Sequence, residues 1–163
     1  MKNKTIWSNR FKNKTSQSFQ KIGSSIHIDK RLYEQDIAAS IVHTQMLVKQ
    51  KIIKSEDGNK IINGLKKIKV QIDKGNFEFK EKFEDIHLNI EKALFEIIGP
   101  SAGFLHTARS RNDQVVTDFK LWVKEASNEI VKDISVVMKC LIKKAEKNTD
   151  TVMPGLTHLK NAQ

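Results

Sequence analysis

The 163-residue sequence has little cysteine, proline or glycine, and each scarcity excludes a class of protein. A single cysteine, Cys140, excludes a disulfide framework within the chain and suits a reducing compartment. Because Cys140 lies in an apolar run, we expect a buried, unreactive thiol. Two prolines and seven glycines beside 39% hydrophobic residues indicate a globular, mainly helical protein rather than a disordered one.

Long apolar runs are also missing. No segment approaches the roughly 20 apolar residues of a membrane span, and the lysine-rich start is not followed by the apolar region of a signal peptide. We therefore expect a cytoplasmic protein with no membrane partner.

Aromatic residues are scarce in a basic chain. The net charge of +10 could indicate a nucleic-acid-binding protein. The lysines, however, are spread from Lys2 to Lys160 among acidic residues, and aromatic side chains for base stacking make up only 7% of the chain. A solvated lysine-rich surface and no nucleic-acid partner are the prediction. A nucleic-acid-binding helical module stays the alternative, and it would bind in a strongly salt-dependent way.

Arginine is rare too, since it supplies only four of the 29 cations. Two of the four, Arg109 and Arg111, lie in GFLHTARSRNDQ, residues 103–114. A guanidinium is a planar fork that suits carboxylate or phosphate, whereas an ammonium is a flexible point charge. This pair therefore suggests a geometric requirement, with chance as the alternative.

Apolar spacing predicts an all-α fold. Residues 1–28 read as an extended arm that packs through the isolated apolar residues Ile6, Trp7, Phe11, Phe19 and Ile22. A first helix from about residue 30 to 53 would be capped by Asp29, and a second would run from Ser55 to Gly75. A third would begin near Glu84 and stop at the Gly-Pro pair of residues 99–100.

The longest periodic run follows a loop at residues 99–110. About 35 residues, from Asn112 to Asn148, would form a rod of roughly 50 Å, longer than a compact domain of this size needs. Its apolar stripe calls for partner helices in other chains or in a missing part of this one. We expect a mainly helical domain at 1–111 and the start of a truncated helical bundle at 112–163.

Three polar clusters could carry chemistry: EDIH at 84–87, HTARSRND at 106–113 and PGLTH at 154–158. Taken singly, each fits helix capping or a helix dipole. The sequence has no Gly-rich phosphate loop, no metal-ligand spacing and no nucleophile elbow. The remaining hydrogen-bond donors suit a carboxylate-bearing substrate and acid–base chemistry with no metal or other cofactor.

In series, EDIHLNIE at 84–91, GPSAGFLHTARSRNDQVVTD at 99–118 and PGLTHLKNAQ at 154–163, with WSNRF at 7–11, resemble the argininosuccinate lyases of the aspartase/fumarase superfamily. The resemblance implies reversible cleavage of argininosuccinate to arginine and fumarate by β-elimination, the last step of arginine biosynthesis, without a cofactor. It also implies a homotetramer whose long-helix bundle brings segments from three subunits into each composite active site.

Residue by residue, the resemblance implies a catalytic role for His158 as proton acceptor, either directly on carbon or through the family's mobile serine. It implies that Ser25, Arg111, Asn112 and Thr157 bind substrate, and that Asp85, His87 and Arg109 support the site. Two departures, WSNRF for WGGRF and PGLTHLK for PGYTHLQ, affect no position expected to be catalytic. The alternatives are another superfamily lyase, of the adenylosuccinate or fumarase type, and a crystallin-like structural relative.

The family's serine-bearing loop, GSSxMPxKxN, does not occur up to Gln163. Because that serine is the proton donor implied by the resemblance, we expect the 163-residue chain alone to release no fumarate from argininosuccinate.

Overall fold

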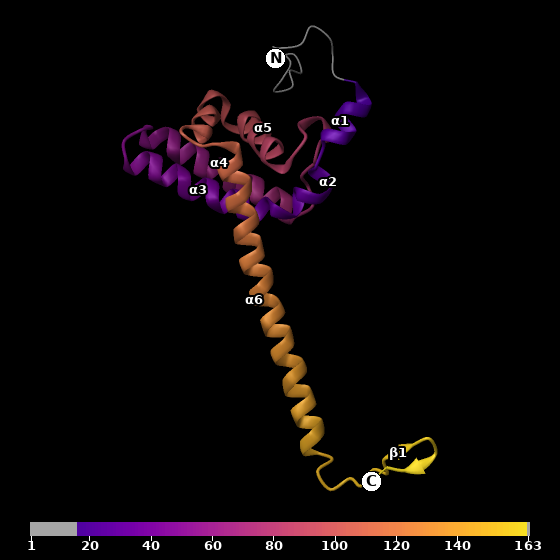
Figure 1. Ribbon diagram of the computed structural model, residues 1–163. Helices are drawn as coiled ribbons and strands as arrows, with labels where there is room; N and C mark the ends of the chain where they lie inside the picture. Colours follow the sequence, from indigo (N-terminus) through magenta and orange to yellow (C-terminus); the bar gives the residue numbers. More distant parts are fainter. Residues whose placement is uncertain (1–15, 163) are drawn as a thin grey trace. The chain divides into compact units, whose positions relative to one another are not determined.

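The computed structural model describes residues 16–162, which belong to two compact units, 1–122 and 123–163. Helices dominate this part of the chain and the two strands are very short (Figure 1), which confirms the all-α prediction. In chain order the elements are α1 (Gln17–Gly23), α2 (Ile26–Asp29), η1 (Lys30–Leu32), α3 (Tyr33–Lys49), α4 (Ser55–Asp73), η2 (Glu81–Phe83), α5 (Ile86–Ile98), η3 (Gly99–His106), α6 (Arg111–Glu146), β1 (Leu156–Thr157) and β2 (Lys160–Asn161).

The core of the first unit lies between α3, α4, α5 and η3. In α4 the fully buried side chains are Ile61, Leu65 and Ile68, at the three- and four-residue steps of one helix face. α5 contributes Ile86, Ile90 and Leu94 on the same rule. Burying a side chain of this size stabilises the fold by about 1.5–3 kcal/mol, so this apolar core holds the three helices together.

Glycine ends both α4 and α5, as predicted. Gly75 has φ 70°, and the amides of Gly75 and Asn76 donate to the carbonyls of Ile72 and Gln71, each at 2.9 Å. These two bonds form a Schellman motif. Gly99, at φ 69° and ψ −144°, ends α5 in a region that residues with a β-carbon avoid. Residues 99–106 then form η3, where the sequence suggested only a loop.

The expected extended arm is wrong for the residues that the structure describes. Residues 17–23 form α1 and residues 26–29 form α2, and the side chain of Ser16 caps α1 by accepting a hydrogen bond from the backbone amide of Phe19 at 3.2 Å. Phe19 and Ile22 do not anchor the segment, because their side chains are 63% and 87% exposed. Residues 1–15, which contain WSNRF, lie outside the described residues.

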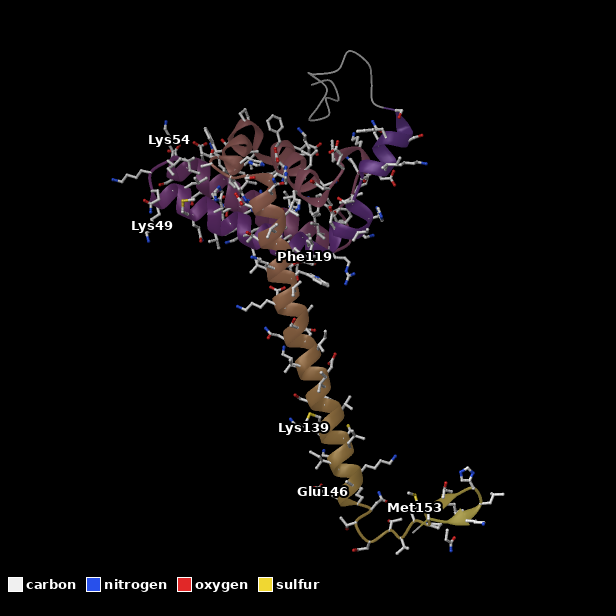
Figure 2. The ribbon with its side chains drawn as sticks, viewed as in Figure 1. Lys49, Lys54, Phe119, Lys139, Glu146 and Met153 are labelled. Atoms are coloured by element: carbon white, nitrogen blue, oxygen red, sulfur yellow. The ribbon has the colours of Figure 1, made fainter. Side chains whose placement is uncertain are left out.

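α6 confirms the long helix. Its 36 residues correspond to about 54 Å at 1.5 Å per residue. Only two of its side chains are buried, and apolar residues of its later part stay exposed: Ile130, Val131, Ile134, Val136, Val137, Met138, Leu141 and Ile142. Cys140 is exposed with them, so its expected burial is wrong for this chain. Figure 2 shows the side chains along the helix, with Lys139 and Glu146 labelled.

The second unit ends in a hairpin that the sequence did not suggest. Leu156 pairs with Asn161, and Thr157 pairs with Lys160 in antiparallel register. The two turn residues between them, His158 and Leu159, have φ values of 49° and 60°. Positive φ at both positions is the pattern of a type I′ turn, which usually takes Asn-Gly. Within residues 16–162 no helix is both long enough and apolar enough to span a membrane.

Candidate functional site

A buried polar cluster lies where α3, α5 and the first turns of α6 meet. We call Asp36, His87, Gln114 and Asp118 the Asp36 cluster; their exposed fractions run from 0% to 5%. The Oδ1 atom of Asp36 lies 2.9 Å from His87 Nδ1 and accepts a hydrogen bond of 2.5 Å from Gln114 Nε2. Asp118 Oδ2 lies 3.5 Å from the same histidine nitrogen. Asp36 is therefore the central acceptor.

The two carboxyls of the cluster take opposite protonation states. Burial, the negative charge of Asp36 and a hydrogen bond to it raise the pKa of Asp118 to about 8. Burial also opposes ionisation of Asp36, but hydrogen bonds and the charge of His87 outweigh it, so the pKa of Asp36 is lowered. Asp36 is thus a carboxylate at neutral pH, while Asp118 is mostly a neutral acid.

His87 gains a proton from the same arrangement. Burial disfavours the imidazolium, but the hydrogen bond and charge of Asp36 outweigh burial, and the pKa of His87 is raised. The cluster therefore pairs a cationic imidazole with one carboxylate, a combination that tolerates burial better than an unpaired charge.

Both arginines of the RSR segment make directed bonds in the first unit. Arg109 Nη1 donates to the hydroxyl of Ser40 at 2.9 Å. Arg111 donates through Nη1 to Gln114 Oε1 at 2.8 Å and through Nη2 to Glu91 Oε2 at 3.0 Å. A fork that bridges two acceptors needs guanidinium geometry, so arginine at 111 fits the expected geometric requirement.

A small cavity adjoins these groups. Its volume is about 10 Å³, which is room for about one water molecule. It is lined by Asp36, His87, Ile90, Glu91, Leu105, His106, Arg109 and Gln114. The cavity is therefore polar but too small to hold a substrate in this chain.

Ser25 and Asp85 lie in a second arrangement, around the backbone of Glu84. Glu84 has φ 62° and ψ −62°, and the amide of Asp85 donates back to the carbonyl of Phe83 at 2.6 Å. This is a γ-turn with positive φ, which is rare and strained. The Glu84 carbonyl accepts hydrogen bonds from the amides of Ser25 and Ile26 at 2.9 and 3.0 Å. The strained turn is thus held by the start of α2.

Asp29 corrects a prediction. It does not cap the helix that follows it; its Oδ1 accepts from the amide of Ile86 at 3.1 Å, at the start of α5. Its Oδ2 accepts from the hydroxyl of Ser25 at 2.6 Å. Asp85 is the N-cap of α5 and accepts from the amide of Leu88 at 2.6 Å. Burial raises the pKa of Asp29 despite these bonds.

The other predicted site residues lie at element boundaries. Asn112 is exposed in the first turn of α6, where its backbone amide donates to the hydroxyl of Ser110 at 3.2 Å. Thr157 is exposed in β1 and His158 in the hairpin turn, both in the second unit. Within the first unit, the structure brings Arg111 and His87 onto one hydrogen-bonded cluster, and joins Ser25 and Asp85 through Asp29 and Glu84.

Sequence reasoning missed Asp36, Gln114 and Asp118. A usable signal was present, because His87 and Glu91, and likewise Gln114 and Asp118, are spaced four apart and so share one face of their helix. Asp36, His87 and Asp118 are also the described residues that could offer three ligand atoms to a cation, all within 4.8 Å of one another. No metal site was predicted from the sequence.

Comparisons with known proteins agree with the motif series. The model of a family described as lyase matches residues 9–163. The argininosuccinate lyase of Pelagibacter ubique is 56% identical over 161 residues, which is 99% of this chain and 35% of that protein. Those of Bartonella bacilliformis and Ehrlichia ruminantium are 49% and 48% identical, over 97% of this chain and 34% of theirs. The chain spans about a third of the length of these relatives.

Proposed function

The chain belongs to this lyase family, and from that premise we propose that the protein is an argininosuccinate lyase, which cleaves argininosuccinate to arginine and fumarate. The observation that carries the proposal is the 56% identity to a protein of that name over 99% of the chain. The exposed donors just before α2, at the end of β1 and at the start of α6 fit the carboxylates of such a substrate.

We propose that the reaction is a β-elimination. A base removes a proton from the carbon next to a carboxylate, the C–N bond breaks, and its electron pair leaves with the arginine nitrogen. Negative charge accumulates on the carboxylate next to the carbanion, so short hydrogen-bond donors stabilise the transition state. We assign that task to Asn112, Thr157 and Ser25, whose hydroxyl would have to turn from Asp29 to the substrate, and the proton-accepting role to His158.

Arg111 joins the proposed substrate-binding set. Two of its five N–H groups are taken by Glu91 and Gln114, which leaves three for a substrate carboxylate. Asp85, His87 and Arg109 support the site, since each is bound to the backbone or to a buried polar side chain of the first unit. The proposed chemistry needs no metal or organic cofactor.

We further propose that the protein is a cytoplasmic homotetramer with composite active sites. The exposed apolar side chains of α6 support this assembly, because such a stripe is stable in water only when other helices cover it. In this assembly α6 belongs to a bundle of long helices, and each site takes segments from three subunits.

The test uses the protein expressed from its complete coding sequence. We expect it to release fumarate, followed by ultraviolet absorbance, from argininosuccinate and not from adenylosuccinate. His158→Asn should lower kcat by about 10²- to 10⁴-fold, the usual contribution of a general base. His27→Asn, at an exposed position in α2, is the matched control and should leave kcat unchanged.

Two results would contradict the proposal. Fumarate from adenylosuccinate alone would indicate a different lyase of the superfamily. No turnover of either substrate by the folded protein would indicate a structural relative.

A further inference from the structure

Gln114 links the buried carboxylate of Asp36 to Arg111, the first residue of α6. Its side chain is 5% exposed, and its two polar ends have different partners. The Nε2 atom donates to Asp36 Oδ1 at 2.5 Å, and the Oε1 atom accepts from Arg111 Nη1 at 2.8 Å. The amide is therefore a two-ended connection from α3 to the surface of α6.

The orientation of this amide is fixed by its neighbours. An ionised carboxylate only accepts hydrogen bonds and a guanidinium only donates them. Asp36 therefore requires the NH₂ end of Gln114, and Arg111 requires the oxygen end. A flipped amide would face an acceptor with an acceptor and a donor with a donor, so only one orientation satisfies both bonds.

A second contact holds the same guanidinium from the α5 side. Arg111 Nη2 donates to Glu91 Oε2 at 3.0 Å, and both side chains are about a third exposed or less. Two bonds to two different nitrogens fix both the position and the plane of the group. The plane matters because Arg111 directly precedes Asn112, so both residues present their donors from the first turn of α6.

Resting on the proposed function, we propose that Gln114 is a positioning residue of the lyase site: anchored on Asp36, its amide holds the Arg111 guanidinium in the orientation that meets a substrate carboxylate. Gln114 does not touch the substrate in this scheme. It acts through Arg111, and Asp36 acts through Gln114.

A cation site in the same cluster is less consistent with the contacts. Asp36 Oδ1, one of the three candidate ligand atoms, is already engaged by His87 and Gln114. The guanidinium of Arg109 also lies near enough to interact with both Asp36 and Asp118. A bound cation would have to displace His87 and Gln114 from Asp36, and it would lie near the positive charge of Arg109.

The sharpest test is Gln114→Glu in the complete protein, compared with wild type from pH 5 to pH 8. A protonated carboxyl at this position reproduces the amide, because its O–H can donate to Asp36 while its C=O accepts from Arg111. Once ionised, it places a second negative charge against Asp36. Burial and Asp36 therefore raise the pKa of the introduced carboxyl above that of an ordinary glutamate.

The expected pH dependence follows from the raised pKa of the introduced carboxyl. The carboxyl is protonated, and supports both stability and activity, at low pH, and this support is lost as pH rises through its raised pKa. Relative to wild type, Tm and kcat/KM should be near normal at pH 5. By pH 8 kcat/KM should be about tenfold lower, mainly through a higher KM. Ratios to wild type at each pH cancel the titration of the surrounding groups, which are Asp36, His87, Glu91, His106, Arg109, Arg111 and Asp118.

Two further variants separate positioning from stability. Gln114→Ala should raise KM by about tenfold at every pH. Thr44→Val removes another buried hydrogen bond of α3, from Thr44 Oγ1 to the Ser40 carbonyl at 2.8 Å, that does not lead to Arg111. It should lower Tm and leave KM and its pH dependence unchanged.

A Gln114→Glu to wild-type ratio that does not vary with pH, or an unchanged KM in folded Gln114→Ala, would overturn the inference. If the wild-type protein itself releases no fumarate, the proposed function fails and the positioning role fails with it. The pH dependence of Tm in Gln114→Glu would still show whether the hydrogen-bonded connection exists.

Discussion

At the residue scale, Asp36 and Asp118 differ in the partners that compensate their burial. Asp36 accepts from Gln114 and lies against His87, and these contacts keep it ionised. Asp118 is buried against the negative charge of Asp36, and its Oδ2 lies 3.5 Å from His87 Nδ1, farther than the 2.9 Å between that nitrogen and Asp36 Oδ1. Asp118 therefore keeps a proton that an exposed aspartate would release.

The protonation of Asp118 predicts a pH dependence of stability. Its pKa rises from an ordinary 3.8 to about 8 on folding, so between those values the folded protein holds a proton that the unfolded chain has lost. The free energy of unfolding therefore falls as pH rises through this window. Asp118→Asn keeps the shape and removes the titration. Between pH 4 and pH 8 the free energy of unfolding of this variant should rise relative to that of wild type by up to a few kcal/mol, measured by urea denaturation of the complete protein.

The control is Asp133→Asn, which removes an exposed carboxyl from the same helix. A constant difference between Asp118→Asn and wild type from pH 4 to pH 8 would show that Asp118 is ionised in the folded state.

The sequence allowed some residues in and around the Asp36 cluster to be predicted, but not all of them. His87, Arg109 and Arg111 could be singled out because they belong to polar clusters with unusual residue types. Asp36 and Asp118 could not, because each sits beside an apolar residue, Ile37 or Phe119, in a run that reads as an ordinary amphipathic helix. Their role depends on which helix faces meet, and that information is not local.

At the scale of elements, α4 is the helix through which α3 and α5 are held together. It carries a glycine on each side: a β-carbon at Gly58 would meet the side chain of Val48 in α3, and one at Gly64 would lie 2.5 Å from Leu94 Cδ1 in α5. Glycine inside a helix costs roughly 0.5–1 kcal/mol relative to alanine, so close helix contact must offset that cost here.

Gly64→Ala should therefore destabilise the protein although alanine favours helix. The added methyl group would force Leu94 and Ile98 to move, since Ile98 Cγ2 would lie at 3.2 Å. Overpacking of this kind costs about 1–3 kcal/mol, which should lower Tm by several degrees in a thermal unfolding experiment. Gly23→Ala is the control and should leave stability unchanged, because an added β-carbon at Gly23 would meet no neighbouring atom within 4 Å. A Gly64→Ala variant as stable as Gly23→Ala would mean that α4 and α5 are loosely packed.

The longer elements were predictable and the short ones were not. α3, α4, α5 and α6 each show several turns of apolar spacing, so periodicity identified them. α1 has seven residues and its apolar side chains are exposed, so it has no periodic signal to detect. The hairpin uses His158 and Leu159 in a turn that normally takes Asn-Gly, and no local rule names such a pair.

At the scale of the whole molecule, the exposed side chains of α6 bear on assembly. Ile130, Ile134, Val137 and Leu141 follow the three- and four-residue steps of one helix face, and each is more than half exposed. We propose that this face packs in a bundle with other subunits. The two compact units meet between residues 122 and 123. The predicted domain boundary at residue 111 stays a prediction.

The double variant Ile134→Asp, Leu141→Asp should disrupt that assembly. Each change places a carboxylate where an apolar side chain would be buried, and each should weaken association by at least about tenfold. Analytical ultracentrifugation of the complete protein should then show species smaller than a tetramer and fumarate release should fall. Asn128→Asp with Ser135→Asp is the matched control, because it adds the same charge at the same seven-residue spacing to exposed polar positions. A double variant that still sediments as a tetramer would place the interface elsewhere.

The same face of α6 also has a consequence during translation. Ribosomes extend a chain by about 5–20 residues per second, and a helix forms far faster than that once it leaves the exit tunnel. A nascent α6 therefore exposes its apolar residues to the surrounding solvent until whatever covers them has been synthesised and has docked. The yield of native protein in the cell then depends on how long that interval lasts, and on the chaperones that shield the helix meanwhile.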